Sequence, residues 1–432
     1  MFALLIYRLA LFCLLPIVLI LLLIRSKNNS AYRQRLLERL GFFPKPAQQG
    51  GIVVHAASVG EVIALKSFIE ALLTAYPNTP ITLTTFTPTG SEQVQKLFSG
   101  RVQHGYLPLD SFPCTQLFLH RLKPKLVIFM ETELWPNLVA QCVSKQIKLL
   151  LINGRLSKKS VHSYSKINHL ITPCLNSFDK ILTQSQENLT HFTQLGTEPS
   201  HCINVGNLKF DISVNASIDE KQAELSQLIK GEGSAKRKIW LVASTHEGDE
   251  VIALTAFGKI LDYFPQLLLV LVPRHPERFE QVATLCQQQG FSIARRSKNT
   301  LVTDQQIWLL DSLGELMAGF SLSDIVTMGG SFSHIGGHNP LEPALFKKPI
   351  IVGSNMSNFS EILEQLLQEN ALMQLSEDKP EQQLANAVKA LLNNPEQQVT
   401  LGEQAHKVVL ANRGASQKTL SHVQALLPTK GA

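Results

Sequence analysis

The chain has 432 residues, of which 44% are hydrophobic and 17% are charged, with a formal net charge of +6. This length exceeds what one ordinary core fills, and the apolar content excludes a disordered chain, so two packed domains are expected. Nucleic-acid binding would require a basic face with aromatic platforms, and the sequence shows none, so that function class is excluded.

The first 25 residues are predicted to form a membrane anchor. Leu9–Ile24 is a run of 16 residues without a charge, which as a helix spans about 24 Å, slightly less than a hydrocarbon core of about 30 Å. Adding Leu4–Tyr7 and letting the Arg8 side chain extend to the interface closes this gap. A cleaved signal peptide is the alternative, but no small-residue cleavage site follows, so an uncleaved helix is favoured.

A basic segment follows the anchor. Residues 25–46 contain six Lys or Arg against Glu38 alone, so 6 − 1 = +5 of the net charge lies there and +1 elsewhere. Basic residues beside a membrane helix stay on the cytoplasmic side and attract anionic headgroups. The six cysteines are scattered without metal-ligand spacing, which also favours a reduced cytoplasmic compartment. There, the glycosylation triplet Asn188–Thr190 would be irrelevant.

Short apolar runs then alternate with polar turns and helical patterns, which is typical of βα units in parallel sheets. The first domain, residues 26–212, has these predicted strands: Gly51–Ala56, Ile81–Phe86, Leu126–Met130, Lys148–Ile152, Lys180–Thr183 and Ile203–Gly206. Residues 213–235 are polar and are predicted to be an interdomain linker.

The second domain is expected over residues 236–432. Its predicted strands are Ile239–Ala243, Leu267–Val272, Ile307–Asp311, Asp324–Met328 and Pro349–Val352. Two Rossmann-like domains facing a cleft would bind ligands at the carboxyl ends of the strands. A final amphipathic helix is expected at Ser416–Leu427, and periodicity leaves open whether it packs back on the first domain.

Three predicted strands are followed by the pattern S-x-x-E, at Ser58–Glu61, Ser244–Glu247 and Ser312–Glu315. In a capping box the serine accepts from a backbone N–H group and the glutamate reaches back. Each pattern alone favours a purely structural role. Together they predict helix N-termini, which attract anions, along the cleft.

Glu61 is a candidate for more than capping. It follows the first predicted strand and Gly60, where the missing side chain would allow close approach of a backbone or a substrate. Attack by a hydroxyl group requires a base, which a carboxylate with a partly raised pKa supplies. His55 could orient this carboxylate, although a purely structural histidine is the more frequent case.

Glu131–Asn137 follows a buried strand and contains two carboxylates, a tryptophan and a proline. One interpretation is a turn leading into a helix that begins near Pro136. The other places Glu131 in the cleft, where it stabilises charge or holds a cation. Lys209 is a candidate for that cation, or for contact with a phosphate or carboxylate. A solvated surface lysine is the equally weighted alternative.

The second domain carries the predicted anion-binding residues. Arg274 follows a strand rich in Leu and Val, where its guanidinium suits a phosphate, whereas Arg278 is interpreted as a surface residue. In Gly329–Pro343, two glycine pairs would let backbone N–H groups come close to a ligand. Asn339–Glu342 matches an N-cap, a first-turn proline and a glutamate, and a helix start there would bind phosphate.

Two side chains of that glycine-rich segment receive separate predictions. Glu342 would also accept from ribose hydroxyls. His334 and His338 are four residues apart, but two glycines between them argue against a helical metal-binding pair.

The chain resembles the Kdo transferases, which transfer 3-deoxy-D-manno-octulosonic acid in Gram-negative envelope synthesis. The resemblance covers nearly the whole chain and includes the anchor with its basic stretch. The other matching segments are His55–Val62, Phe129–Asn137, Asn153–Ser157, Gly206–Asp211, Ala243–Glu250, Val272–Arg278 and Gly329–Ala344. It implies the glycosyltransferase-B fold, CMP-Kdo as donor, and a lipid A precursor, lipid IVA, as acceptor at the anionic surface of the inner membrane.

The resemblance also implies roles for individual residues. Glu61 would be the base on the acceptor hydroxyl, and Glu131 and Lys209 would support the transition state. CMP would be bound by Pro273 and Arg274, by Leu313, Gly314 and Glu315, and by Asn339, Pro340, Leu341 and Glu342. We expect an inverting transfer, for which one base suffices. Since protein donors can neutralise the leaving phosphate, no obligatory metal or other cofactor is expected.

Three other functions are weighed against this one. A glycosyltransferase of the same architecture that uses a UDP sugar would bind UDP in preference to CMP. A soluble nucleotide-sugar epimerase has a similar fold but no lipid partner, so the anchor weighs against it. A non-enzymatic membrane-anchored binding protein is disfavoured by the number of polar motifs at strand ends. The sequence makes no prediction of the oligomeric state.

Overall fold

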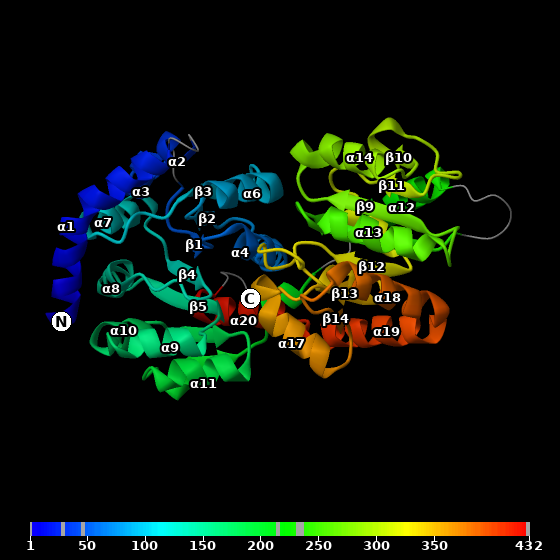
Figure 1. Ribbon diagram of the computed structural model, residues 1–432. Helices are drawn as coiled ribbons and strands as arrows, with labels where there is room; N and C mark the ends of the chain where they lie inside the picture. Colours follow the sequence, from blue (N-terminus) through cyan, green and yellow to red (C-terminus); the bar gives the residue numbers. More distant parts are fainter. Residues whose placement is uncertain (1, 27–30, 45–47, 213–216, 230–236, 429–432) are drawn as a thin grey trace. The chain divides into compact units, whose positions relative to one another are not determined.

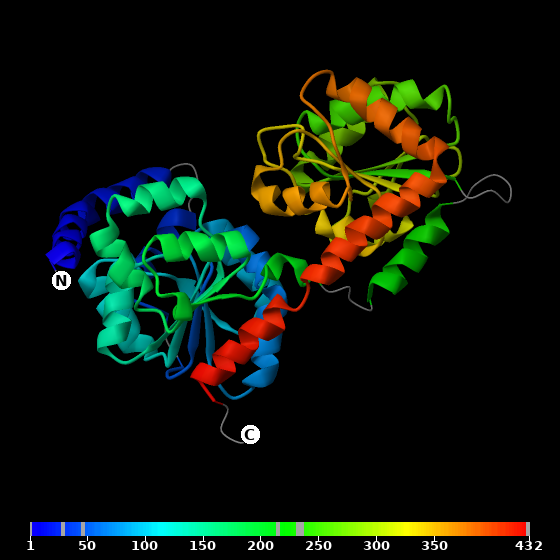
Figure 2. The same ribbon diagram turned by 90° about the horizontal axis from the view of Figure 1, so that it is seen from below.

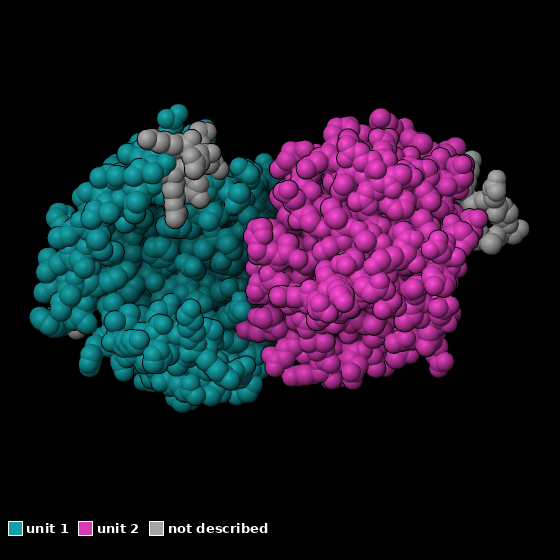
Figure 3. Space-filling view, in the orientation of Figure 1, with its two compact units in different colours: residues 1–211, 412–432 teal, residues 212–411 magenta. Residues whose placement is uncertain are grey.

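The computed structural model describes residues 2–26, 31–44, 48–212, 217–229 and 237–428. They form two compact units, coloured separately in Figure 3: residues 1–211 with 412–432, and residues 212–411. Each unit contains one seven-stranded sheet with helices packed around it (Figure 1). The predicted fold class, two Rossmann-like α/β domains, is therefore confirmed.

Unit 1 is built on a parallel sheet of order β3-β2-β1-β4-β5-β6-β7. Its strands are β1 (Ile52–His55), β2 (Ile81–Thr85), β3 (Gln103–Tyr106), β4 (Leu126–Met130), β5 (Lys148–Gly154), β6 (Lys180–Thr183) and β7 (Cys202–Asn204). The order reverses between β1 and β4. At such a switch point the outgoing loops diverge and leave a crevice at the carboxyl ends of the strands.

The helices of unit 1 cover both faces of this sheet. They are α1 (Phe2–Arg25), α2 (Ala31–Gln34), α3 (Leu36–Arg39), α4 (Val59–Ala64), α5 (Lys66–Ala75), α6 (Pro88–Phe98), α7 (Phe112–Leu122), α8 (Pro136–Ser144), α9 (Lys158–Ser165), α10 (Asn168–Leu175), α11 (Gln186–Gln194) and α20 (Ala415–Leu426). Ile52 and Val54 of β1 pack with Phe68 of α5, whereas Val53 packs with Phe118 of α7 on the other face. Burial on both faces explains why the central strands are nearly continuous apolar runs.

The C-terminal helix α20 belongs to unit 1 although it follows unit 2 in the chain. Figure 2 shows this red helix lying on unit 1, where it packs against α5 and β5. The Asp211 carboxylate accepts from the backbone N–H groups of Gly414 at 2.7 Å and Ser416 at 2.5 Å. Tyr76 of α5 donates its hydroxyl to the Leu427 carbonyl at 2.6 Å. Residues 412–428 therefore belong to unit 1, which answers the open question whether the final helix packs back on the first domain.

Unit 2 repeats the same plan with the parallel order β10-β11-β9-β8-β12-β13-β14. Its strands are β8 (Ile239–Thr245), β9 (Leu268–Pro273), β10 (Ile293–Arg295), β11 (Ile307–Leu309), β12 (Ile325–Met328), β13 (Ile350–Val352) and β14 (Met373–Gln374). Its helices are α12 (Ser217–Leu228), α13 (Asp249–Leu261), α14 (Phe279–Gln288), α15 (Leu316–Leu322), α16 (Leu341–Leu345), α17 (Ser360–Gln368), α18 (Pro380–Asn393) and α19 (Pro395–Asn412). Its switch point lies between β8 and β12.

Helix α12 occupies part of the segment predicted to be a linker, residues 213–235. It packs against α15 and buries Ile218 and Leu225. Lys221 donates to the Gly314 carbonyl at 2.9 Å. This stretch is thus a helix of unit 2, and its polar composition reflects a surface helix that buries only a narrow stripe. Residues 213–216 and 230–235 of the predicted linker lie outside the described residues.

One helix of the described chain, α1, is long and apolar enough to cross a membrane, with a mean hydropathy of 2.7 over Phe2–Ile24. The prediction that Arg8 extends to the membrane interface is wrong. Arg8 Nε donates to Asn137 Oδ1 at 2.8 Å, and its guanidinium lies 4.9 Å from the centroid of the Phe112 ring. Unit 1 therefore supplies this cation with partners.

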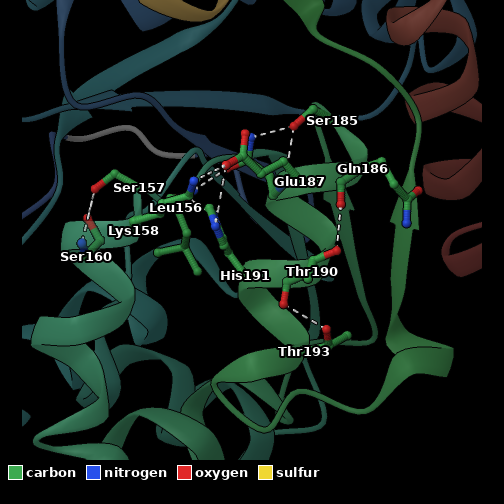
Figure 4. A network of polar contacts seen from close by, with 11 residues as sticks. Leu156, Ser157, Lys158, Ser160, Ser185, Gln186, Glu187, Thr190, His191 and Thr193 are labelled. Atoms are coloured by element: carbon green, nitrogen blue, oxygen red, sulfur yellow. Dashed lines mark hydrogen bonds and ion pairs between the residues drawn. The ribbon is translucent and has the colours of Figure 1, made fainter.

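The glycosylation triplet has a structural role. Figure 4 shows the polar contacts between α11 and the segment that includes Leu156. Asn188 of α11 is buried. Its Oδ1 accepts from the Leu156 N–H group at 2.6 Å, and its Nδ2 donates to Ser185 Oγ at 2.7 Å. His191 Nδ1 donates to the Leu156 carbonyl at 2.5 Å. These bonds fix the loop after β5 to α11 and leave the Asn188 amide engaged inside the fold.

Candidate active site

Glu61 lies in the first turn of α4, directly after β1 at the switch point of unit 1. Ser58 Oγ donates to Glu61 Oε1 at 2.8 Å and accepts from the Glu61 N–H group at 3.4 Å. The Ala57 N–H group donates to Glu61 Oε2 at 3.0 Å. The predicted capping box is confirmed here, and its two donors hold the half-buried carboxylate in one orientation.

The electrostatic surroundings make Glu61 an unusually strong base for a carboxylate. Burial, and then the negative charge of Glu131, raise the pKa of Glu61 to about 7, against hydrogen bonds from Ser58 and Ala57 that lower it. A base near pH 7 combines a substantial ionised fraction with a strong tendency to take a proton. Glu61 can therefore accept a proton from a bound hydroxyl group.

Glu131 and Lys209 form an ion pair at the carboxyl ends of the strands, as Glu61 follows the carboxyl end of β1. Lys209 Nζ lies 3.5 Å from Glu131 Oε1, and the two side chains are 18% and 19% exposed, so Lys209 is not a solvated surface lysine. Glu131 has φ 57°, a left-handed conformation that costs a non-glycine residue about 1–2 kcal/mol. The structure thus brings Glu61, Glu131 and Lys209 together in unit 1.

Glu133 and Trp135 also belong to this cluster, although the sequence analysis assigned them no role. Trp135 Nε1 donates to Glu133 Oε2 at 3.0 Å, and the buried His55 Nε2 lies 3.6 Å from the same oxygen. Burial raises the pKa of Glu133, but contacts with His55 and Trp135 outweigh it and hold the pKa below its usual value. Glu133 is therefore a fixed negative charge.

His55 does not orient Glu61, so that hypothesis is wrong. Its Nδ1 lies 3.2 Å from the Thr84 carbonyl and 3.0 Å from Thr84 Oγ1. A carbonyl oxygen only accepts, so Nδ1 carries a hydrogen and Nε2 is the nitrogen that faces Glu133. His55 therefore joins β1, β2 and the loop after β4.

The other two S-x-x-E patterns do not cap helices as predicted. Ser244 lies within β8 with φ 54°, and α13 begins only at Asp249. Ser312 Oγ does donate to the Glu315 carboxylate, but α15 begins after Glu315. Arg296 also donates to both Glu315 oxygens, with distances from 2.8 to 3.1 Å. The Glu315 side chain is thus engaged within the protein.

Asp249 joins the two loops at the switch point of unit 2. Its Oδ2 accepts from the N–H groups of His246, after β8, at 2.8 Å and of Gly330, after β12, at 2.7 Å. Burial raises the pKa of Asp249 to about 6. The Gly337 N–H group donates to the Gly330 carbonyl at 2.8 Å. The N–H groups of Gly330 and Gly337 are therefore used inside the protein, contrary to the prediction that they crowd a ligand.

Three histidines from three different strand ends meet near Arg274. His246 Nε2 lies 2.9 Å from His338 Nε2, and the His275 ring centroid lies 5.2 Å from that of His246. Of two nitrogens in such a contact only one carries a hydrogen, so the pair holds at most one positive charge. Burial, and then the charges of His246, Arg274 and His275, lower the pKa of His338 to about 3. A bound anion here would favour the protonated form of these histidines, because an opposite charge stabilises a positive one.

Arg274 is exposed directly after β9, and its backbone N–H group donates to the Thr245 carbonyl at 3.0 Å. Burial raises the pKa of Glu342 to about 7, although the positive charge of Arg274 opposes it. Asn339 Oδ1 accepts from the Leu341 N–H group at 3.1 Å. Helix α16 begins at Leu341, one residue later than predicted. Pro340 is therefore the N-cap residue and not the first residue of the helix.

The interpretation of Arg278 as a surface residue is wrong. Arg278 binds the buried Glu250 through two hydrogen bonds of 2.7 and 3.1 Å. Thr245 Oγ1 donates to the same carboxylate at 2.6 Å. Removing one partner of such a buried pair leaves an uncompensated charge. Arg278 therefore stabilises the loop after β8, whereas Arg274 extends from the end of β9.

Gly329 and Gly60 make contrasting predictions for stability. A Cβ atom at Gly329 would lie 2.7 Å from the Ala243 carbonyl oxygen, whereas one at Gly60 meets nothing within 4 Å. We expect Gly329→Ala to lower the free energy of unfolding of unit 2 by about 1–3 kcal/mol. Gly60→Ala should change that of unit 1 by less than about 1 kcal/mol. Urea unfolding of both variants measures this, and equal effects would contradict the close packing at Gly329.

Among the described residues, no group of three or more His, Cys, Asp or Glu is arranged to hold a metal ion. The described groups that could meet an anionic ligand in unit 2 are organic cations and neutral donors, Arg274 and the histidine cluster. The negative charge of an anionic ligand could therefore be neutralised here by protein side chains.

Comparison with known proteins identifies the family. A family model described as 3-deoxy-D-manno-octulosonic-acid transferase (kdotransferase) matches residues 34–212. The 3-deoxy-D-manno-octulosonic acid transferase of Haemophilus influenzae is 42% identical over 410 residues, which covers 94% of each chain. That of Rickettsia typhi is 34% identical over 383 residues and covers 88% of this chain and 80% of the relative.

A solved structure shares the fold. UDP-GlcNAc 2-epimerase from Neisseria meningitidis bound to UDP-GlcNAc gives a TM-score of 0.57 at 14% identity, covering 87% of this chain and 100% of that one. At this identity the likeness shows only the shared two-domain architecture. Activity is indicated by the sequence relatives instead, which match most of the chain and carry one name. The chain therefore belongs to the 3-deoxy-D-manno-octulosonic acid (Kdo) transferases and is a glycosyltransferase.

Proposed function

We propose that this Kdo transferase moves Kdo from CMP-Kdo to a lipid A precursor, lipid IVA, with inversion at the anomeric carbon and release of CMP. The observation that carries the proposal is Glu61, a carboxylate held by two donors with a pKa of about 7 beside the Glu131–Lys209 pair. Such a base suits the activation of an acceptor hydroxyl group.

The reaction is a single displacement. The acceptor oxygen forms a bond to the anomeric carbon of Kdo while its proton passes to Glu61. The bond between that carbon and the phosphate oxygen breaks, and its electron pair stays on CMP. One displacement inverts the configuration, so one base and no covalent enzyme intermediate are needed. The Glu131–Lys209 pair keeps its two opposite charges fixed beside Glu61 while the Glu61 carboxylate takes up the proton and becomes neutral.

Unit 2 supplies the donor site in this proposal. The phosphate of CMP-Kdo meets Arg274, whose guanidinium suits a phosphate, and the neighbouring hydrogen-bonded pair His246 and His338. The other CMP contacts are Pro273, Leu313, Gly314, Glu315, Asn339, Pro340, Leu341 and Glu342. Because the Glu315 carboxylate is bound by Arg296, its contribution comes from the backbone of that loop. Charge neutralisation by these residues supports a reaction without an obligatory metal.

The activity should depend on pH through the ionisation of Glu61. Because only the ionised carboxylate accepts a proton, kcat/KM should be constant above about pH 7 and fall about tenfold per pH unit below it. Glu131→Gln removes a negative neighbour, so it should move this inflection to lower pH, with a lower maximal rate. The profiles of both proteins at constant ionic strength measure this. An inflection that is unmoved in the variant would contradict the assignment.

The alternative donor is a UDP sugar, because other glycosyltransferases of this architecture use one. Competition binding separates the two: purified protein is loaded with a fluorescent CMP analogue and titrated with CMP or UDP. The proposal expects CMP to compete at much lower concentration than UDP. Preferential displacement by UDP would overturn the donor assignment while leaving the family assignment in place. The family assignment already argues against the epimerase and the non-enzymatic binding protein.

We also propose that the chain acts at the inner membrane with both units on the cytoplasmic side. The apolar helix α1 and the +5 charge of residues 25–46 support attachment to an anionic surface. An acceptor that carries acyl chains remains in that membrane, so attachment brings enzyme and acceptor to the same plane.

A further inference from the structure

Tyr7 and Arg8 of α1 both face unit 1. They are the only residues of α1 before Arg25 whose side chains carry a hydroxyl or charged group. The Tyr7 hydroxyl donates to Asp110 Oδ2 at 3.0 Å, and Arg8 Nε donates to Asn137 Oδ1 at 2.8 Å. The Asp110 carboxylate also accepts from the N–H groups that begin α8, both at 2.9 Å. The first two turns of α1 are thus bonded to the body of unit 1.

A stripe of α1 continues this contact along the helix. The less exposed residues recur every three or four positions, as expected for one helical face: Ala3, Leu4, Tyr7, Arg8, Leu11, Leu15, Val18, Leu19 and Leu22. Figure 1 shows α1 running along the edge of unit 1, where it contacts α8 and α10. Helix α1 is therefore attached along its length and not only at its C-terminal end.

The opposite face of α1 is apolar and exposed. It carries Phe2, Leu5, Ile6, Leu9, Phe12, Ile17, Ile20, Leu21 and Ile24, each more than half exposed. A continuous apolar face of this size on a soluble body marks a site that meets another apolar phase. The basic segment that follows supplies charge complementary to anionic headgroups.

These contacts are incompatible with a helix that crosses the bilayer. Tyr7 and Arg25 are 18 residues apart, or about 27 Å along the helix, close to the thickness of a hydrocarbon core. If Arg25 were at the cytoplasmic surface of a spanning helix, Tyr7 would be near the opposite surface. Asp110 and Asn137 belong to a folded body that cannot enter hydrocarbon.

We propose that α1 lies in the plane of the membrane surface, with its exposed face in the lipid and its Tyr7 and Arg8 face on unit 1. The enzyme is then held on one leaflet by an interfacial helix. This inference rests on the membrane attachment in the proposed function. Asp110 and Asn137 also fix the start of α8, which directly follows Trp135. These contacts therefore connect the lipid-facing helix α1 to the cluster around Glu61, to which Trp135 belongs.

Labels at three positions on one face of α1 test the proposal. Ile6, Cys13 and Ile20 are seven residues apart, so they share a face and are separated by about 10 Å along the helix. Cys13 is exposed, whereas the other five cysteines are buried. A spin label is attached to native Cys13, or to Ile6→Cys or Ile20→Cys combined with Cys13→Ser. Its depth is measured in vesicles of neutral and anionic phospholipid.

An in-plane helix predicts similar, shallow depths of about 5–10 Å at all three positions. A spanning helix would place position 13 deepest, with positions 6 and 20 near opposite surfaces, and that profile would overturn the proposal. Three labels that remain in water would overturn it as well. Kdo transfer is measured on the same vesicles. Equal shallow depths without transfer would leave this inference standing and sink the proposed function.

Discussion

Glu61→Gln is expected to reduce kcat by about 10²–10⁴-fold, the range that a general base contributes. The glutamine amide can still accept from the Ala57 N–H group, and it can donate to Ser58 Oγ, which in the native protein donates to the carboxylate. The fold and the capping box should therefore survive while the basicity is lost. Initial rates of CMP release measure the effect, and CMP affinity should be nearly unchanged because the proposed CMP site lies in unit 2.

Ser58→Ala is the matched control for Glu61→Gln. It removes the capping hydroxyl at a cost of about 1 kcal/mol in stability but leaves the Glu61 carboxylate in place. Its loss of kcat should be far smaller than that of Glu61→Gln. Near-native turnover by Glu61→Gln would show that another group accepts the proton. Equal losses in the two variants would reduce Glu61 to a capping residue.

Arg274→Ala is expected to weaken CMP binding by about 10- to 100-fold, because a hydrogen-bonded charge is worth about 1.5–3 kcal/mol. Arg274→Lys keeps the charge but loses the planar fork, so its affinity should be intermediate. Titration calorimetry with CMP measures both variants. The effect should appear mainly in KM for CMP-Kdo, since in the proposed complex the arginine meets the phosphate in the ground state and the transition state alike.

The control for Arg274→Ala removes an equal charge elsewhere in unit 2. Lys238 directly precedes β8, so it lies at the amino-terminal end of the strands, opposite to Arg274. There it forms an ion pair with Asp324 at 3.2 Å. Lys238→Ala should leave CMP affinity within about twofold, because exposed pairs contribute little. If both variants lost affinity equally, overall charge and not a phosphate contact would explain the effect of Arg274.

The strands that the sequence predicted most accurately are largely buried. β4 and β6 were predicted to the residue, since strands covered on both faces are continuous apolar runs. β3, β10 and β14 were not predicted, because they are short and begin with or contain polar residues such as Gln103, Arg295 and Gln374. These strands are too short and too polar to show the periodic apolar pattern by which a strand is recognised in a sequence.

The sequence predicted that Glu61, Glu131 and Lys209 follow strand ends, but it left open which of these side chains contact each other. Glu61 and Glu131 come together because β1 and β4 are neighbours in the sheet, and strand order is not encoded in local periodicity. Lys209 comes after β7 and reaches Glu131 from a turn that is held by the Leu208 N–H group, which donates to Asn153 Oδ1 of β5 at 2.9 Å. The contact between His246 and His338 arises in the same way across β8 and β12. With the strand order known, Glu61 and Glu131 would be placed at the switch point of unit 1, and His246 and His338 at that of unit 2.

Local geometry also decided which S-x-x-E pattern forms a capping box. Ser58 has the extended conformation that an N-cap requires, with φ −124° and ψ 167°. Ser244 instead has φ 54° inside a strand end. The same four-residue pattern therefore produces a cap in one place and a bulged strand in the other, and only the surrounding sheet distinguishes them.

Mass spectrometry of the reaction product is the most direct test of Kdo transfer by this chain. Purified protein is incubated in lipid vesicles with CMP-Kdo and lipid IVA, in parallel with Glu61→Gln. The native chain should yield lipid IVA heavier by one or more Kdo residues, with one CMP released for each, and the variant should yield almost none. Unmodified lipid IVA with the native chain, or transfer only from a UDP sugar, would contradict the account.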